Sequence, residues 1–270
     1  MRELIIERKE ILLGTNVTIK VIEPDLERAI EAIKSAFNEI RRIEDIMSEF
    51  RDDSEVSILN HTKFIKNPSK DLVYVLRKSE EYFEISDGAF DIMASTKPRP
   101  RMTIKNDEIR VNCSSKINIS LGGIAKGYAV DKAIEVLQGL GIRRALIDAG
   151  GDIRVLDGKS DKHLWTIGIR DPTRKESFTT VIKLFDKSVA TSGTYGKTKI
   201  IDPRTGELIK DPVSATVIAD KAIDADTLST LSIISPEIGL RIVKRLGFEA
   251  FIIYQSGKIL KTPGFKEYEV

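Results

Sequence analysis

The chain has 270 residues, of which 41% are hydrophobic and 31% charged, so it is long enough to bury a large core. Lysine and arginine (43) nearly balance aspartate and glutamate (41), and a net charge of +2 argues against a dedicated nucleic-acid-binding protein, which would show a basic excess. Cys113 is the single cysteine, which excludes a disulfide framework and a cysteine-based metal site.

No run of about 18 apolar residues occurs, so no membrane-spanning helix is predicted. The first residues, MRELIIERKE, are charged from Arg2 onward and lack the apolar segment of a signal peptide. We therefore expect a soluble, cytoplasmic protein, and an exported form stays open if a leader precedes this sequence.

The first part of the chain is expected to begin with two strands and three helices, followed by a hairpin and a further strand. Alternating β-branched residues predict the strands, and apolar residues spaced three, four and seven apart predict the first helix. Asp25, Ser54 and Ser69 are suitable N-caps. The predicted elements are strands at 3–8 and 12–22, helices at 25–50, from about 54, and at 69–85, a hairpin turning at 106–107, and a strand at 115–119.

The second part is rich in strands and ends with helices. The predicted elements are a helix ending at 139–141, several strands between 144 and 193, a strand followed by a turn at 199–207, a strand at 214–220, helices at 224–233 and 236–247, and a hairpin turning at 256–257. Because helices and strands do not alternate regularly, the order predicts an α+β fold with antiparallel sheets. The length allows either one large domain or two small lobes.

The predicted helix at 224–233 carries polar residues among apolar ones, in the segment DADTLST. Asp226 and Thr230 are four residues apart, so they share one face of the helix. A carboxylate and a hydroxyl there suit a hard cation such as Mg²⁺. The structural alternative is that Asp224 caps the helix and Asp226 lies at its positive end. Taken alone, the segment favours this alternative.

Several glycine-rich segments suggest a ligand that lies against backbone. In SLGGIAKG, residues 120–127, the glycines allow close approach, helix-opening amides favour an anion, and Lys126 adds a cation. The segment matches neither a P-loop nor the Rossmann fingerprint. Further glycine breaks occur in IDAGGD (147–152) and ATSGTYG (190–196). Together they predict a dinucleotide with a pyrophosphate as the ligand.

These segments closely resemble the FAD:protein FMN transferase (ApbE) family. The resemblance covers nearly the whole chain in order, and GGIAKGYAVD followed by IIDPRTG and DADTLST is specific. The matching segments are LGTNVTIKV, DDSEVSILN, GAFDI, SLGGIAKGYAVD, IDAGGDIRV, WTIGIRDP, VATSGTYG, KIIDPRTGE and SATVIADKAIDADTLST.

The resemblance implies one domain, residues 1–270, with an α+β fold of two interleaved lobes around a nucleotide cleft. The cleft would hold FAD with Mg²⁺ on its pyrophosphate. The resemblance also implies an enzyme that moves FMN from FAD to a threonine hydroxyl of a target protein and releases AMP. A subunit of a redox complex is one option for this acceptor. By position, it implies metal ligands at the Gly123 carbonyl, Asp226 and Thr230. The implied flavin and adenine contacts are Leu13, Phe50, Ala89, Phe90, Asp91, Ser120, Lys126 and the backbone near Ile200.

The chain departs from the family pattern most clearly at Lys199, where a histidine is usual and is a candidate catalytic base. A lysine serves as a base only where its surroundings lower its pKa. Otherwise Asp202 or a metal-bound group must take the proton. Ser120 also replaces a common aspartate. Two alternatives therefore stay open: an FAD pyrophosphatase giving FMN and AMP, and a flavin-binding protein without catalysis.

Overall fold

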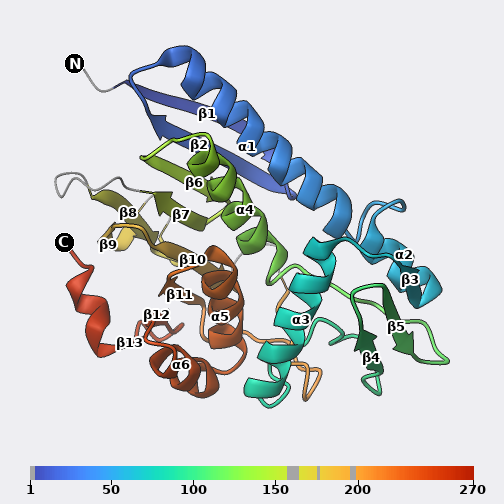
Figure 1. Cartoon of the computed structure of the whole chain (residues 1–270). Helices are drawn as coiled ribbons and strands as arrows, with labels where there is room; N and C mark the ends of the chain where they lie inside the picture. The colour runs from blue at the N-terminus through green and yellow to red at the C-terminus, as the bar shows by residue number, and fades with distance from the viewer. Residues whose placement is uncertain (1–3, 157–163, 175–176, 195–198) are drawn as a thin grey trace.

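The computed structural model describes residues 4–156, 164–174, 177–194 and 199–270. Its centre is an antiparallel sheet of eight strands, which are labelled in Figure 1. In spatial order the strands are β1 (Ile5–Leu12), β2 (Thr15–Ile22), β6 (Ala145–Ala149), β7 (Asp152–Leu156), β10 (Ser188–Gly193), β11 (Ser214–Ala219), β12 (Glu249–Ile253) and β13 (Ile259–Lys261).

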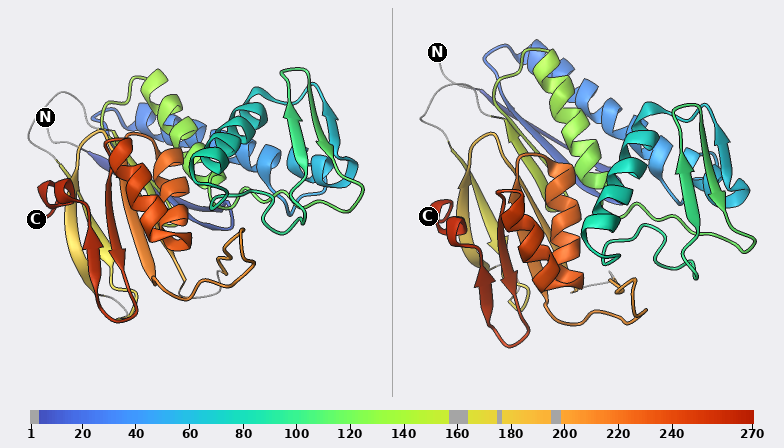
Figure 2. Two further views of the ribbon diagram at one scale, coloured as in Figure 1. Left: turned by 90° about the horizontal axis from the view of Figure 1, so that it is seen from below. Right: turned by 60° about the horizontal axis from the view of Figure 1, so that its bottom comes forward.

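The sheet separates a helical layer from a smaller β layer (Figure 2). One face packs against α1 (Leu26–Met47), α4 (Ala125–Gly139), α5 (Ala222–Ile234) and α6 (Pro236–Arg245). The other face packs against the hairpin β8 (Trp165–Arg170) and β9 (Phe178–Leu184), and against the short helix η1 (Pro263–Glu267).

Strand β7 shows how the two-residue period of a strand serves both layers. Ile153 and Val155 belong to the apolar cluster under the β8–β9 hairpin. Asp152 and Arg154 lie on the opposite face, where they contact Lys126 and Asp131 of α4. The sheet therefore places a carboxylate and a guanidinium directly under a helix.

A second group of elements lies beyond the end of the helical layer, at the right of Figure 1. We call it the small lobe and the remainder the large lobe. It consists of α2 (Glu55–Thr62), α3 (Lys70–Ile85) and a sheet of β3 (Phe64–Lys66), β5 (Glu108–Asn112) and β4 (Arg101–Ile104). Its buried residues Leu59 and Leu76 share one apolar core with Ile19 of β2. The α+β fold with antiparallel sheets is therefore confirmed.

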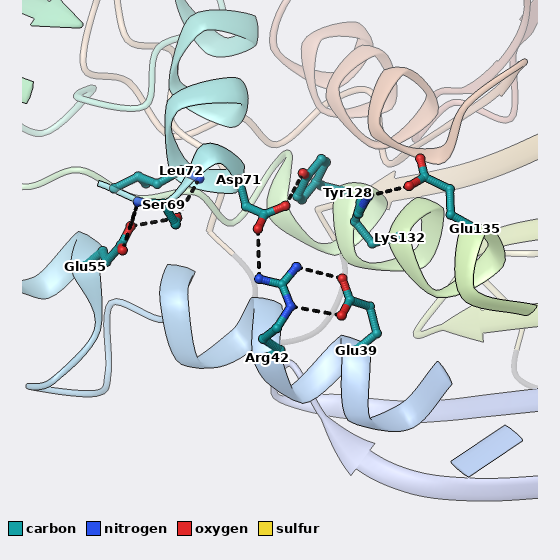
Figure 3. A network of polar contacts seen from close by, with 9 residues as sticks. All are labelled: Glu39, Arg42, Glu55, Ser69, Asp71, Leu72, Tyr128, Lys132 and Glu135. Carbon is teal, nitrogen blue, oxygen red and sulfur yellow. Dashed lines mark hydrogen bonds and ion pairs between the residues drawn. The ribbon is translucent and has the colours of Figure 1, made fainter. Parts of the chain in front are cut away.

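A polar network around Asp71 fixes the small lobe to the helical layer (Figure 3). Its carboxylate accepts hydrogen bonds from Arg42 of α1 at 2.8 Å and from the Tyr128 hydroxyl of α4 at 2.5 Å. Burial raises the pKa of Asp71, but these two hydrogen bonds outweigh it and hold the pKa below its usual range. Nearby, Glu55 accepts from the Ser69 amide and hydroxyl, which links α2 to the start of α3.

The predicted helix starts are confirmed by their caps. Asp25 accepts from the Arg28 amide, Ser54 from the Ser57 amide and Ser69 from the Leu72 amide. No helix within the described ranges combines the length and the apolar character needed to cross a bilayer.

The predicted strand at 115–119 is wrong, because these residues have no regular secondary structure. The Asn60 side chain donates to the Ile119 carbonyl at 3.0 Å and accepts from its amide at 2.6 Å. A side chain therefore satisfies the backbone groups that a neighbouring strand would otherwise pair. The predicted strand near 199–207 is reduced to one bridge between Ile201 and Leu208.

Candidate active site

The N-terminal ends of α4 and α5 meet, and their contact fixes the centre of the site. A Cβ atom on Gly127 would lie 2.3 Å from the Ala222 carbonyl oxygen, so glycine is required for this approach. Asp131 of α4 accepts from the amides of Ala222 at 2.9 Å and Ile223 at 3.0 Å, and it pairs with Arg154. Helix α5 is therefore capped by a residue of another helix.

The alternative that Asp224 caps α5 is wrong, because this residue lies inside the first turn of the helix. Its carboxylate accepts a hydrogen bond from the Tyr82 hydroxyl at 2.7 Å and lies 3.5 Å from the Lys78 ammonium. Both partners belong to α3, so Asp224 ties the start of α5 to the small lobe.

Asp226 lies buried at the junction of α4 and α5. One carboxylate oxygen accepts from the Gly127 amide at 3.1 Å, and the other lies 3.4 Å from the Lys126 ammonium. Lys126 also pairs with Asp152, which is 2% exposed. Two buried carboxylates thus share one ammonium, so the cluster carries a net negative charge whenever both carboxylates are ionised, and that charge favours a further cation.

The pKa values of this cluster follow from the same contacts. Burial alone would lower the pKa of Lys126, but the carboxylates of Asp152 and Asp226 outweigh it and raise the pKa, so the ammonium keeps its charge. Burial, followed by repulsion from Asp226, raises the pKa of Asp152 to about 7, although Lys126 opposes the change.

Thr230 follows Asp226 by one helical turn and faces Gly123. A Cβ atom on Gly123 would lie 3.2 Å from the Thr230 hydroxyl oxygen. That hydroxyl is 3.0 Å from the Ser192 hydroxyl of β10. The structure thus brings the residues Gly123, Asp226 and Thr230, from which the metal ligands are predicted, to one junction. A carboxylate, a hydroxyl and a backbone carbonyl beside a net negative charge fit the hard oxygen ligands that Mg²⁺ takes.

A pocket opens beside this junction, with about 570 Å³ of space, part of it open to solvent. Three predicted ligand contacts, Leu13, Phe50 and Lys126, line it. Leu13 has a left-handed φ of 55°, in the two-residue turn between β1 and β2, and its amide donates to Glu44 at 2.8 Å. Phe50 is 91% exposed. The other lining residues are Gly14, Ile43, Glu44, Met47, Ser48, Glu49, Leu121, Gly122 and Ala125.

The remaining predicted contacts differ in their burial and in their hydrogen-bond partners. Ser120 donates to Glu49 of the pocket wall at 2.7 Å. Ala89 and Phe90 are buried, and the Phe90 ring lies 3.3 Å from the position of a Cβ atom on Gly123.

Two further predicted contacts already have partners within the protein. The Asp91 side chain accepts from Arg99 at 3.0 Å and from the Met93 amide at 2.9 Å. Ile200 is half-buried, and its carbonyl accepts from the Ile209 amide.

The two predicted catalytic groups lie on the segment before β11. Lys199 is exposed. The Asp202 carboxylate accepts from the Arg204 guanidinium at 2.7 and 3.0 Å and from the Arg204 amide at 2.8 Å. These hydrogen bonds hold the pKa of Asp202 below its usual range. Asp202 therefore stabilises the turn that follows Lys199. Residues 195–196 of the glycine-rich segment at 190–196 lie outside the described residues.

Three residues of the site were not predicted from the sequence: Asp131, Asp152 and Ser192. The position of Asp152, directly after two glycines and inside an apolar strand, is the one local signal that indicated a buried acid. Asp131 and Ser192 gave no such signal, because their partners lie on other elements.

Gly127→Ala is expected to destabilise the protein by about 1–3 kcal/mol, because the new methyl group would collide with backbone rather than with a movable side chain. Urea unfolding measures the change. The matched control is Gly139→Ala, at the end of the same helix, where a Cβ atom would meet nothing within 4 Å. Equal stability of the two variants would contradict the close contact between α4 and α5.

Comparison with known proteins identifies relatives over the whole chain. The FAD:protein FMN transferase of Vibrio cholerae serotype O1 is 28% identical over 303 aligned residues, which cover 95% of this chain and 88% of that protein. The FAD:protein FMN transferase of Escherichia coli K12 is 32% identical over 167 residues, which cover 56% of this chain and 48% of that protein. The alignment therefore spans about half the length of the Escherichia coli relative.

Solved structures and the family model agree with this result. The ApbE protein of Thermotoga maritima superimposes with a TM-score of 0.88 at 25% identity, covering 99% of this chain and all of that one. The flavin transferase ApbE of Vibrio cholerae has the same fold, with a TM-score of 0.84 at 23% identity and coverage of 99% and 100%. The model of the ApbE family matches residues 13–96 and 93–252, so the chain belongs to the ApbE family.

Proposed function

We propose that this protein is a Mg²⁺-dependent FAD:protein FMN transferase that works as one unit of two lobes. The observation that carries the proposal is the junction of α4 and α5, where Gly123, Lys126, Asp226 and Thr230 meet beside an open pocket. The names of the two curated relatives support the same activity.

In the proposed reaction, a threonine hydroxyl of an acceptor protein attacks the phosphorus atom of the FMN half of FAD. The new bond joins the threonine oxygen to that phosphorus, the bond to the bridging oxygen breaks, and AMP leaves. The hydroxyl proton passes to a base. Such transfers need charge neutralised on the phosphates and the attacking oxygen held in line.

Asp226, Thr230 and the Gly123 carbonyl would hold Mg²⁺. When bound, the ion would neutralise charge on the pyrophosphate. Lys126 holds Asp226 in place, and since an ammonium has three donors and two carboxylates engage it, one donor stays free for a phosphate oxygen. Buried Asp152 keeps Lys126 charged.

The pocket would receive the rest of the dinucleotide. Phe50 offers an exposed ring for stacking, and Leu13 adds apolar surface. The buried residues Ala89 and Phe90 would fix the position of Gly123, against which the Phe90 ring packs. Ser120 and the backbone near Ile200 would add polar groups.

Lys199 is the proposed base, and Asp202 is proposed to position the segment that carries it. Because Lys199 is exposed, only the bound dinucleotide and acceptor could supply the surroundings that let a lysine give up its proton. If Lys199 takes the proton, the rate of transfer rises with pH, and Lys199→Met removes that rise. Lys199→Arg also fails, because arginine does not give up its proton. Lys210→Met, at another exposed lysine of this segment, is the control. Superimposable pH–rate profiles for wild type and Lys199→Met would remove Lys199 from the mechanism.

Product analysis tests the proposal. Purified protein is incubated with FAD and a threonine-containing acceptor peptide in the presence of Mg²⁺ or EDTA, and bound FAD is followed by its fluorescence. We expect saturable quenching of FAD fluorescence at micromolar protein, no comparable binding of NAD, and metal-dependent release of AMP. FAD that stays bound but intact with Mg²⁺ and acceptor present would instead indicate a flavin-binding protein without catalysis.

A further inference from the structure

The charged groups of the pocket are divided between two elements. The end of α1 and the loop after it supply the carboxylates of Glu44 and Glu49, whereas the start of α4 supplies Lys126. Carboxylates repel phosphate groups. The wall that carries Glu44 and Glu49 therefore suits an uncharged part of the ligand that offers hydrogen-bond donors.

The two carboxylates have different roles. Glu44 accepts from the amide of Leu13 and so holds the strained turn between β1 and β2. In Glu49, one oxygen accepts from the Ser120 hydroxyl at 2.7 Å, and the second has no hydrogen-bond partner in the part of the chain that the structure describes. Ser120 thus orients a carboxylate that still has a free acceptor.

The residue after Glu49 indicates which kind of ligand group binds the free carboxylate oxygen. Phe50 follows directly, and its ring is 91% exposed at the edge of the pocket. A planar ring stacked on Phe50 would cover this apolar surface and present N–H groups at its edge. A sugar hydroxyl attached to that ring offers the same donor chemistry.

We propose that Glu49, oriented by Ser120, accepts a hydrogen bond from a neutral N–H or O–H donor of the dinucleotide and thereby determines the specificity of the pocket. This inference rests on the proposed function, since it takes FAD as the ligand. Because the carboxylate accepts and does not donate, it favours ligands with a donor at this position over those with a carbonyl or a phosphate.

Binding titrations with Mg²⁺ held constant test the inference without requiring turnover. Wild type, Glu49→Ala and Glu49→Gln are titrated with FAD, AMP and FMN. We expect Glu49→Ala to weaken FAD binding by roughly ten- to a hundredfold, as is typical when one hydrogen bond to a charged group is lost. Glu49→Gln keeps an acceptor oxygen and should lose less. Asp53→Ala is the control, because it removes an exposed carboxylate from the same loop.

Comparison of AMP with FMN shows which half of FAD carries the hydrogen-bond donor. A loss that recurs with AMP places it on the adenosine half, and a loss that recurs with FMN places it on the flavin half. An FAD dissociation constant within about twofold of wild type in both Glu49 variants would overturn the inference while leaving the proposed function intact. Absence of FAD binding in wild type would instead overturn the proposed function.

Discussion

Asp226→Ala is expected to lower Mg²⁺-dependent turnover of FAD on the order of a thousandfold, because it removes the one charged ligand among the three proposed. The fold should persist, since Lys126 keeps Asp152 as its partner after the substitution. Thr230→Ala removes a neutral ligand and should cost less. Calorimetric titration of Mg²⁺ gives a readout that does not depend on activity, and the variant should show weakened binding.

Asp220→Ala is the matched control for this experiment. Asp220 lies just before α5, and its exposed carboxylate pairs with Lys187 away from the junction. Mg²⁺ binding and turnover of this variant should match wild type. An Asp226→Ala variant with unchanged metal dependence would show that the proposed ligands do not hold the ion.

Asp131→Ala is expected to destabilise the protein by about 3–5 kcal/mol, the usual cost of removing one partner of a buried ion pair. It would leave the Arg154 guanidinium without its carboxylate under α4. It would also leave the amides of Ala222 and Ile223 without an acceptor at the start of α5. Urea unfolding at neutral pH measures the change.

Asp131→Asn separates the two effects, because the amide oxygen can still accept from the α5 amides while the charge is lost. It should fall between wild type and the alanine variant. The capping of α5 by Asp131 would be contradicted if the free energy of unfolding of Asp131→Ala lay within about 1 kcal/mol of the wild-type value, which is roughly the scatter of ordinary surface substitutions.

Local signals account for what the sequence could predict. The caps of α1, α2 and α3 lie within three residues of the amides that they bind, so Asp25, Ser54 and Ser69 were recognisable. The helical period likewise predicted that Asp226 and Thr230 share a face of α5.

Contacts between distant segments account for the remainder. The cap of α5 comes from Asp131, 91 residues earlier, and no local pattern indicates it. Asp152 has a local signal, its position after two glycines, but its partner Lys126 lies 26 residues earlier on α4 and no local pattern indicates that contact. The segment 115–119 has the composition of a strand, but its backbone is bound by Asn60, 59 residues away from Ile119. The sequence therefore indicates Lys126 and the residues proposed as ligands, but not Asp131 and Asp152, which position α5 and Lys126.

The most direct test of the proposed activity is mass spectrometry of acceptor peptides after incubation with the protein, FAD and Mg²⁺. A peptide pool with threonine in varied contexts is compared with the same pool carrying alanine instead. We predict that some threonine peptides gain the mass of FMN less one water, with equimolar AMP, and that EDTA and Asp226→Ala abolish the gain. Free FMN and AMP with every peptide unmodified would contradict transfer and indicate hydrolysis of FAD.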